Sequence, residues 1–172
     1  MSGDVVHAIR DRVRELAAER PYHQLVLVVG DLKSGKTTAV RAAAADTTWA
    51  YLSLGAALAE RLLHVPTRQR PTVVQQLAED IARAVSGDVL AIDNIELLFH
   101  PDLAVDPLRL LLALSRHRVV VATWPGTVDG TTLTYAEPGH PEYRREPRPA
   151  CAIVTLSPTP AAVPASPTRG EP

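Results

Sequence analysis

The sequence has little cysteine, little net charge and no long hydrophobic segment. Its single cysteine, Cys151, excludes an internal disulfide and a cysteine-rich zinc site, so we expect a neutral packing thiol in a reducing compartment. The formal net charge of −1 argues against a protein that holds nucleic acid through a basic surface, and any such contact is expected to be indirect. No apolar run approaches the roughly 20 residues of a membrane span, and charged residues interrupt the N-terminal segment where a signal peptide would be apolar. These absences predict a cytoplasmic protein without membrane contact.

The composition that remains is that of one globular domain. The chain has 172 residues, of which 46% are hydrophobic and 22% charged, and a single core usually runs to roughly 100–200 residues. From Ser157 onward, however, prolines alternate with alanine, serine and threonine, a composition that buries too little apolar surface to offset the entropy of ordering. We therefore expect a folded domain over residues 1–156 and a disordered, proline-rich tail over 157–172.

Segments typical of strands alternate with segments typical of helices. Strands are expected over 25–29, 49–54, 89–93, 119–123, 133–135 and 152–156, with a turn at 128–131. Helices are expected near 4–19, 36–45 and 56–63, from Pro71 to about 85, and over 108–114. This alternation predicts an α/β fold with a doubly wound, mostly parallel sheet, whose ligands bind at the carboxyl ends of the strands. The chain after Thr123 has too little helical sequence for the helical lid of a full AAA+ motor.

One motif in the sequence is strongly specific. Residues 30–37, GDLKSGKT, match G-x-x-x-x-G-K-[S/T], the Walker A pattern, between an expected strand and an expected helix. Backbone N–H groups of such a loop point at phosphates, and the following helix adds its dipole. We expect Lys36 to contact the β- and γ-phosphates of ATP and the Thr37 hydroxyl to ligate Mg²⁺. The predicted nucleotide-binding residues are Gly30, Asp31, Leu32, Lys33, Ser34, Gly35, Lys36, Thr37 and Thr38, with the Lys33 side chain itself expected in solvent.

A second acid-bearing segment follows about fifty residues later. The apolar residues 89–92 lead into Asp93, which suits a buried Walker B strand that brings a carboxylate to Mg²⁺ through a metal-bound water. Hydrolysis also requires a group that orients the attacking water. Many P-loop ATPases have a glutamate directly after the Walker B aspartate, whereas this chain has Asn94 there and Glu96 two positions later. If the chain turns at once after Asp93, Glu96 can reach the γ-phosphate as the catalytic base; if it stays extended, alternation directs Glu96 elsewhere.

Three further residues are weaker candidates. Thr123 ends an apolar run and is either a polar sensor of the γ-phosphate or an ordinary threonine at the end of a strand. Arg116 and Arg118 precede that run, and in a homo-oligomer one of them could act as an arginine finger in a neighbouring subunit. The alternative for each arginine is a solvent-exposed surface residue.

Two stretches go beyond general P-loop chemistry. Residues 92–99, IDNIELLF, and residues 133–143, LTYAEPGHPEY, together with the Walker A motif, resemble the BrxF family, the small P-loop proteins of type 3 BREX bacteriophage-resistance systems. The resemblance covers about residues 22–148. It implies an ATP-binding subunit of a multi-protein antiviral complex that works with other BREX subunits, and it assigns only Gly30, Gly35, Lys36 and Thr37 to phosphate and magnesium and Asp93 to the metal. It implies no role for the segment 135–143.

Several functions stay open on the sequence alone. The first is an AAA+-like ATPase that regulates or remodels partners; the second is a nucleotide-gated adaptor with little or no hydrolysis, which Asn94 favours. A helicase-loader type of ATPase and a small-molecule kinase are further alternatives, although no arginine-bearing lid for a kinase is evident. The segment 135–143 is either a docking or nucleotide-edge loop or a structural loop, and Arg144, Arg145 and Arg148 behind it form a small basic cluster.

Overall fold

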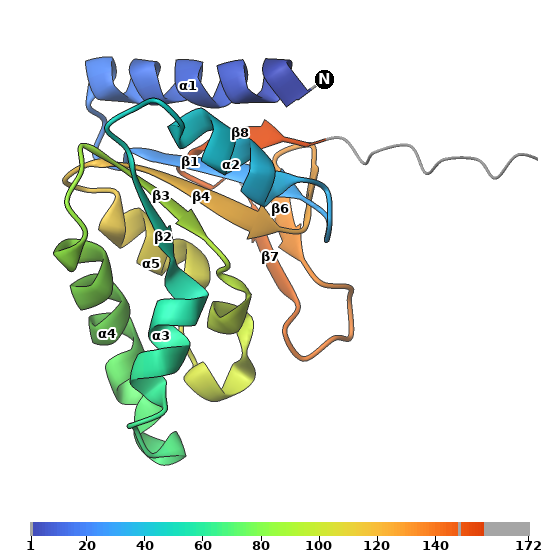
Figure 1. Ribbon diagram of the computed structural model, residues 1–172. Coiled ribbons are helices and arrows are strands. Elements are labelled where there is room, and N and C mark those ends of the chain that lie inside the picture. Colours follow the sequence, from blue (N-terminus) through green and yellow to red (C-terminus); the bar gives the residue numbers. More distant parts are fainter. Residues whose placement is uncertain (1, 148, 157–172) are drawn as a thin grey trace, which may run out of the picture.

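The computed structural model describes residues 2–147 and 149–156 (Figure 1). Arg148 and the expected tail over 157–172 lie outside the described residues. The main sheet is parallel with the order β2-β3-β4-β1-β8. Its strands are β1 (Leu25–Gly30), β2 (Ala50–Ser53), β3 (Val89–Asp93), β4 (Val119–Pro125) and β8 (Ala152–Thr155). The helices are α1 (Ser2–Glu19), α2 (Lys36–Ala44), α3 (Leu54–Leu62), α4 (Arg70–Ala84) and α5 (Pro107–Leu114). Short 3₁₀ turns occupy η1 (Thr67–Gln69), η2 (Glu96–Phe99) and η3 (Pro101–Leu103).

Helices cover both faces of this sheet, which confirms the predicted α/β fold and its parallel strands. Strand β1 is buried along its whole length, and its side chains alternate between two apolar cores. Val26 and Val28 pack in the core formed with α1 and α2, whereas Leu25 and Leu27 pack in the core formed with α3, α4 and α5. Figure 1 shows α1 and α2 together on one side of the sheet and α3, α4 and α5 on the other. Burial on both faces explains why the strands have continuous apolar sequences.

Helix α1 is hydrogen-bonded to the C-terminal end of helix α2. Arg10 of α1 donates hydrogen bonds to the carbonyls of Ala42, Ala43 and Ala45, at 3.2, 3.0 and 2.9 Å. These carbonyls lie at the C-terminal end of α2, where no further turn of helix donates N–H groups to them, and where a cation also complements the helix dipole. Because α2 begins directly after the glycine-rich loop, α1 helps to hold that loop in place.

A second, smaller sheet follows β4 and differs from the expectation. It is antiparallel and consists of β5 (Thr127–Asp129), β6 (Thr132–Tyr135) and β7 (Arg144–Pro147). The expected turn at 128–131 was therefore partly wrong, because the reversal is confined to Gly130 and Thr131, and β7 was not predicted. Trp124 ties this sheet to β4 by donating from Nε1 to the carbonyl of Thr134 at 3.0 Å. The described chain after β4 contains strands and no helix.

Within the described residues, no helix is both long enough and apolar enough to cross a bilayer.

Candidate nucleotide-binding site

The glycine-rich loop, residues 30–37, connects β1 to α2 as the sequence predicted. A Cβ added to Gly30 would lie 2.4 Å from the Ser34 hydroxyl oxygen, and Gly35 has a φ of 91°, in the left-handed region. Both glycines are therefore required by the path of the loop. The backbone N–H groups of Gly35, Lys36 and Thr37 make no hydrogen bond to the described part of the chain. Donors gathered at the start of a helix in this way suit an anion.

Lys36 is the best-buried lysine of the described chain, with 8% of its surface exposed. Its Nζ donates to the carbonyl oxygens of Gly30 and Asp31, both at 2.7 Å. Burial lowers the pKa of Lys36, although the negative charges of Glu96, Asp31 and Asp93 oppose this shift. The ammonium group thus folds back over the loop and lies among acidic groups, so that a phosphate would compete with carbonyl oxygens for it. Lys33, in contrast, is exposed.

Asp93 ends β3 and receives hydroxyl donors from both neighbouring strands. Tyr51 of β2 donates to Oδ2 at 2.7 Å, and Thr123 of β4 donates to Oδ1 at 2.8 Å. Burial would raise the pKa of Asp93, but hydrogen bonds from Tyr51, Thr123 and Thr37 and from the backbone of Asn94 together lower it. The carboxylate is therefore ionised at neutral pH and fixed in orientation. Thr123, which the sequence left open as a γ-phosphate sensor or an ordinary threonine, lies within β4 beside Asp93, and Tyr51 was not predicted.

Thr37 and Asp93 fit a magnesium ion chemically. Thr37 is close enough to lower the pKa of Asp93, and the pair offers one hydroxyl and one carboxylate, the oxygen donors that Mg²⁺ prefers. No group of three or more histidine, cysteine or acidic side chains in the described chain could hold a metal by itself. A magnesium ion at Thr37 and Asp93 would therefore need further ligands from phosphate oxygens and water, which is how proteins commonly bind it with nucleotides.

The chain turns immediately after Asp93, which decides between the two paths considered for Glu96. Asn94 has a φ of 56°, its Nδ2 lies 3.4 Å from the Ser53 hydroxyl, and its carbonyl accepts from the N–H of Gly55 at 2.8 Å. Glu96 then opens η2. Its Oε2 is buried without a hydrogen-bond partner in the described chain, and its charge is the foremost acidic influence on Lys36. Glu96 is therefore close enough for its charge to raise the pKa of Lys36, and the side chain of Asn94 turns toward β2.

The two arginines considered as arginine fingers lie before β4, at the amino-terminal end of the parallel strands, opposite the glycine-rich loop. Arg118 donates to the carbonyls of Ala82, Val85 and Gly87 at the end of α4, with 2.7 Å to Val85, and burial lowers its pKa. Its guanidinium is therefore engaged within its own subunit. Arg116 is exposed and lies over the ring of Tyr22, 5.5 Å from the ring centroid. Neither arginine contacts the glycine-rich loop of its own chain.

The segment 135–143 joins the small sheet to the turn that carries Glu96. The ring of Tyr135 lies 3.7 Å from that of Phe99, centroid to centroid, and its hydroxyl donates to Glu142 at 3.1 Å. Burial and the neighbouring Glu142 raise the pKa of Tyr135 to about 12, so that the phenol stays protonated. These contacts make Tyr135 a structural support of η2.

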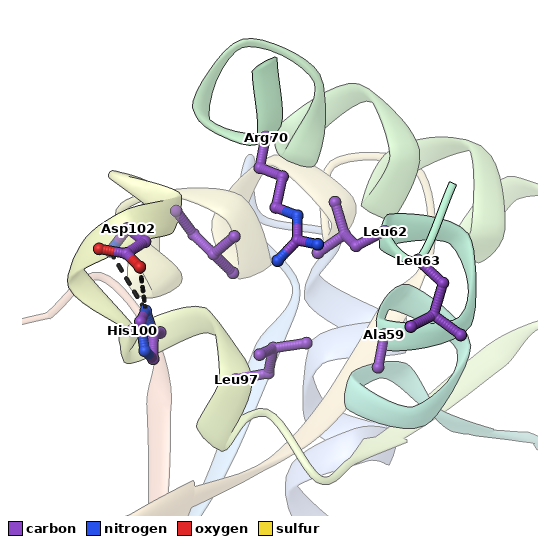
Figure 2. Close-up of a pocket in the computed structure, with 8 residues that line it drawn as sticks. Ala59, Leu62, Leu63, Arg70, Leu97, His100 and Asp102 are labelled. Atoms are coloured by element: carbon purple, nitrogen blue, oxygen red, sulfur yellow. Dashed lines mark hydrogen bonds and ion pairs between the residues drawn. The ribbon is translucent and has the colours of Figure 1, made fainter. Parts of the chain in front are cut away.

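A surface pocket lies on the far side of the same turn. It has a volume of about 230 Å³ and is lined mainly by leucines of α3, η2 and η3, with Arg70, His100 and Asp102 among its polar groups (Figure 2). Leu97 is the residue through which this pocket touches η2, and none of the predicted site residues lines it. The pocket is therefore separate from the glycine-rich loop.

Comparison with known proteins assigns no family. No protein-family model matches the chain, and no curated protein is significantly similar to it.

Proposed function

We propose that this protein is a P-loop NTPase of the AAA+-like class that binds Mg²⁺-ATP. The observation that carries the proposal is the glycine-rich loop between a buried strand and a helix, with Asp93 delivered beside Thr37 by a separate strand. Strand β4 lies between β1 and β3, which is the arrangement of P-loop ATPases with an extra strand between the two Walker motifs. Ligands of open parallel sheets bind at this carboxyl edge.

Each residue of the site has a defined task in this proposal. The N–H groups at the start of α2 bind phosphate oxygens, and Lys36 exchanges its two carbonyl partners for the β- and γ-phosphates. Thr37 would ligate Mg²⁺ directly, and Asp93 would hold it through a bound water. When bound, the ion neutralises charge that develops on the phosphates. The buried setting strengthens these interactions, because water competes less for the charged groups.

Glu96 is the group that we assign to the attacking water. In hydrolysis the water oxygen bonds to the γ-phosphorus, the bond to the β–γ bridging oxygen breaks, and ADP and phosphate leave. The proton of the water goes to the carboxylate of Glu96, whose Oε2 has no partner in the described chain. The same geometry favours ATP hydrolysis over ATP binding alone. The Asn94 side chain points toward Ser53, so that Glu96 is the residue left to act on the attacking water.

In the cell we propose a subunit of an antiphage defence complex, in line with the resemblance to BrxF, in the cytoplasm and beside other BREX subunits. There it would regulate or remodel partners according to its nucleotide state. The competing proposal is an adaptor that binds ATP and hydrolyses little of it. Asn94 directly after Asp93 favours that alternative, whereas the place of Glu96 favours an ATPase.

Lys36→Ala tests the nucleotide site, with Lys33→Ala as the matched control in the same loop. Loss of the Lys36 ammonium removes charge-assisted hydrogen bonds, so we expect Mg²⁺-ATP to bind about 100-fold more weakly. Lys33 is exposed, and its replacement should weaken binding severalfold at most. A titration with a fluorescent ATP analogue measures both. Equal affinities for the two variants would contradict the proposed site.

A further inference from the structure

We infer that Tyr51 is a positioning residue, which holds the Asp93 carboxylate in the orientation that a magnesium-bound water requires. The inference rests on the proposed Mg²⁺-ATP function and extends it to a residue outside both Walker motifs. Tyr51 lies 42 positions before Asp93 in the sequence, and only the pairing of β2 with β3 brings the two together.

The sheet register explains this contact. Ser53 of β2 is the partner of Asp93, and Tyr51 is the partner of Ala91, two positions earlier on each strand. Residues two apart in a strand share a face, so Tyr51 and Asp93 both face α2. The long tyrosine side chain then spans the distance along the sheet and places its hydroxyl 2.7 Å from Oδ2.

The two oxygens of the carboxylate are held by different strands. Tyr51 holds Oδ2 and Thr123 holds Oδ1, at 2.7 and 2.8 Å, so the plane of the group is fixed from both sides. Each carboxylate oxygen can accept more than one hydrogen bond, and the side of the group toward α2 is the one that the Thr37 hydroxyl contacts. A magnesium ion that takes the Thr37 hydroxyl as its ligand would free that acceptor site for a bound water. A metal-bound water on that side would meet an acceptor that is already aligned and needs no reorganisation.

Arg41 in turn restrains Tyr51. Its guanidinium carbon lies 4.9 Å from the centroid of the Tyr51 ring, which is within the range of a cation–π contact. Arg41 follows Thr37 by one turn of α2, so the two residues lie on one face of the helix, beside the face that Ala39, Val40 and Ala43 bury. One face of α2 therefore carries both Thr37, the candidate metal ligand, and Arg41, which contacts the Tyr51 ring.

The test is Tyr51→Phe, with Tyr22→Phe as the control. The first variant keeps the ring under Arg41 and removes only the hydroxyl, whereas Tyr22 is 71% exposed and lies near Arg116, at the other edge of the sheet. Binding of a fluorescent ATP analogue is titrated with Mg²⁺ and, separately, measured in EDTA. We expect half-saturation of Tyr51→Phe to need about 2- to 10-fold more Mg²⁺, the net worth of about one ordinary hydrogen bond, with unchanged affinity in EDTA and no change for Tyr22→Phe.

Four results separate the hypotheses. An unchanged Mg²⁺ requirement in Tyr51→Phe overturns the positioning role. Equal weakening with and without Mg²⁺ also overturns it, because this marks a general structural defect, which thermal unfolding of the same samples would register. In an Asp93→Asn background, removal of the Tyr51 hydroxyl should have no further effect on the Mg²⁺ requirement. Absence of nucleotide binding by the wild-type chain would instead refute the proposed function itself.

Discussion

Among single residues, Glu96 bears most directly on the proposed hydrolysis of ATP. Its Oε2 is buried without a partner in the described chain, and its charge acts on Lys36. Glu96→Gln keeps the size of the side chain and removes its ability to take a proton. We expect unchanged Mg²⁺-ATP affinity and a turnover at least about 100-fold lower, the usual contribution of a general base.

Phosphate release measures the turnover of Glu96→Gln, and Glu137→Gln on an exposed loop is the control. The control should keep wild-type turnover, because Glu137 is exposed beyond β6 and its side chain makes no hydrogen bond to the glycine-rich loop. If Glu96→Gln turns over as fast as the wild type, the proton transfer belongs to another group. If both proteins turn over very slowly, the result favours the adaptor alternative.

The sequence predicted some of these residues and missed others for a physical reason. The positions of Gly30, Gly35 and Lys36 follow from one continuous motif, because the path of the loop backbone fixes their spacing. The position of Glu96 depends on the backbone of Asn94, which has a left-handed φ of 56°. No pattern in the sequence predicts this conformation. Tyr51 reaches Asp93 through strand pairing, so its role is a matter of sheet register and leaves no local signature.

Among the elements, α4 depends on an arginine from outside the helix. Arg118 donates to carbonyls of residues 82, 85 and 87, where the helix ends and the chain turns toward β3. Arg118→Met keeps much of the side-chain volume and removes these hydrogen bonds together with a favourable charge at the helix end. We expect the free energy of unfolding to fall by about 2 kcal/mol.

Urea denaturation measures this loss, and Arg116→Met is the control from the same end of the sheet. Arg116 makes an exposed contact with the Tyr22 ring, so its replacement should cost less than about 1 kcal/mol. Similar, small losses for both variants would show that the carbonyls at the end of α4 are satisfied by water as well as by Arg118.

Helices and strands were predictable where buried apolar residues recur regularly in the sequence. They were not predictable where contacts with distant segments determine the conformation. Strand β3 has the predicted bounds because every one of its residues is buried. Strand β7 (Arg144–Pro147) has no apolar periodicity and ends in a proline, so nothing in its sequence indicates a strand. Pairing with β6, itself anchored by Trp124 and by the Tyr135–Phe99 contact, gives this segment its strand conformation.

For the whole molecule, the distribution of charged residues bears on whether one chain forms the proposed catalytic site by itself. Lys36, Asp93 and Glu96 gather at the carboxyl edge of the main sheet, but no arginine of the described chain hydrogen-bonds or stacks against any of the three. Phosphoryl transfer in P-loop NTPases commonly gains from an arginine supplied by a neighbour. Because Arg118 is engaged at α4, Arg116 is the remaining exposed candidate of the two. It lies at the amino-terminal end of the strands, so a neighbouring subunit in a head-to-tail assembly would present it to the proposed site.

This arrangement predicts that turnover per subunit rises with protein concentration, measured as phosphate release with Lys36→Ala as the background. It also predicts complementation: Lys36→Ala keeps Arg116 but has no working site, and Arg116→Ala keeps the site but has no arginine to offer. Each alone should be inactive, and a mixture should regain part of the wild-type rate, because mixed neighbours join an intact site to an intact arginine. If turnover does not depend on concentration and the mixture stays inactive, copies of this chain do not complete each other's sites. The missing positive charge would then have to come from a different partner subunit.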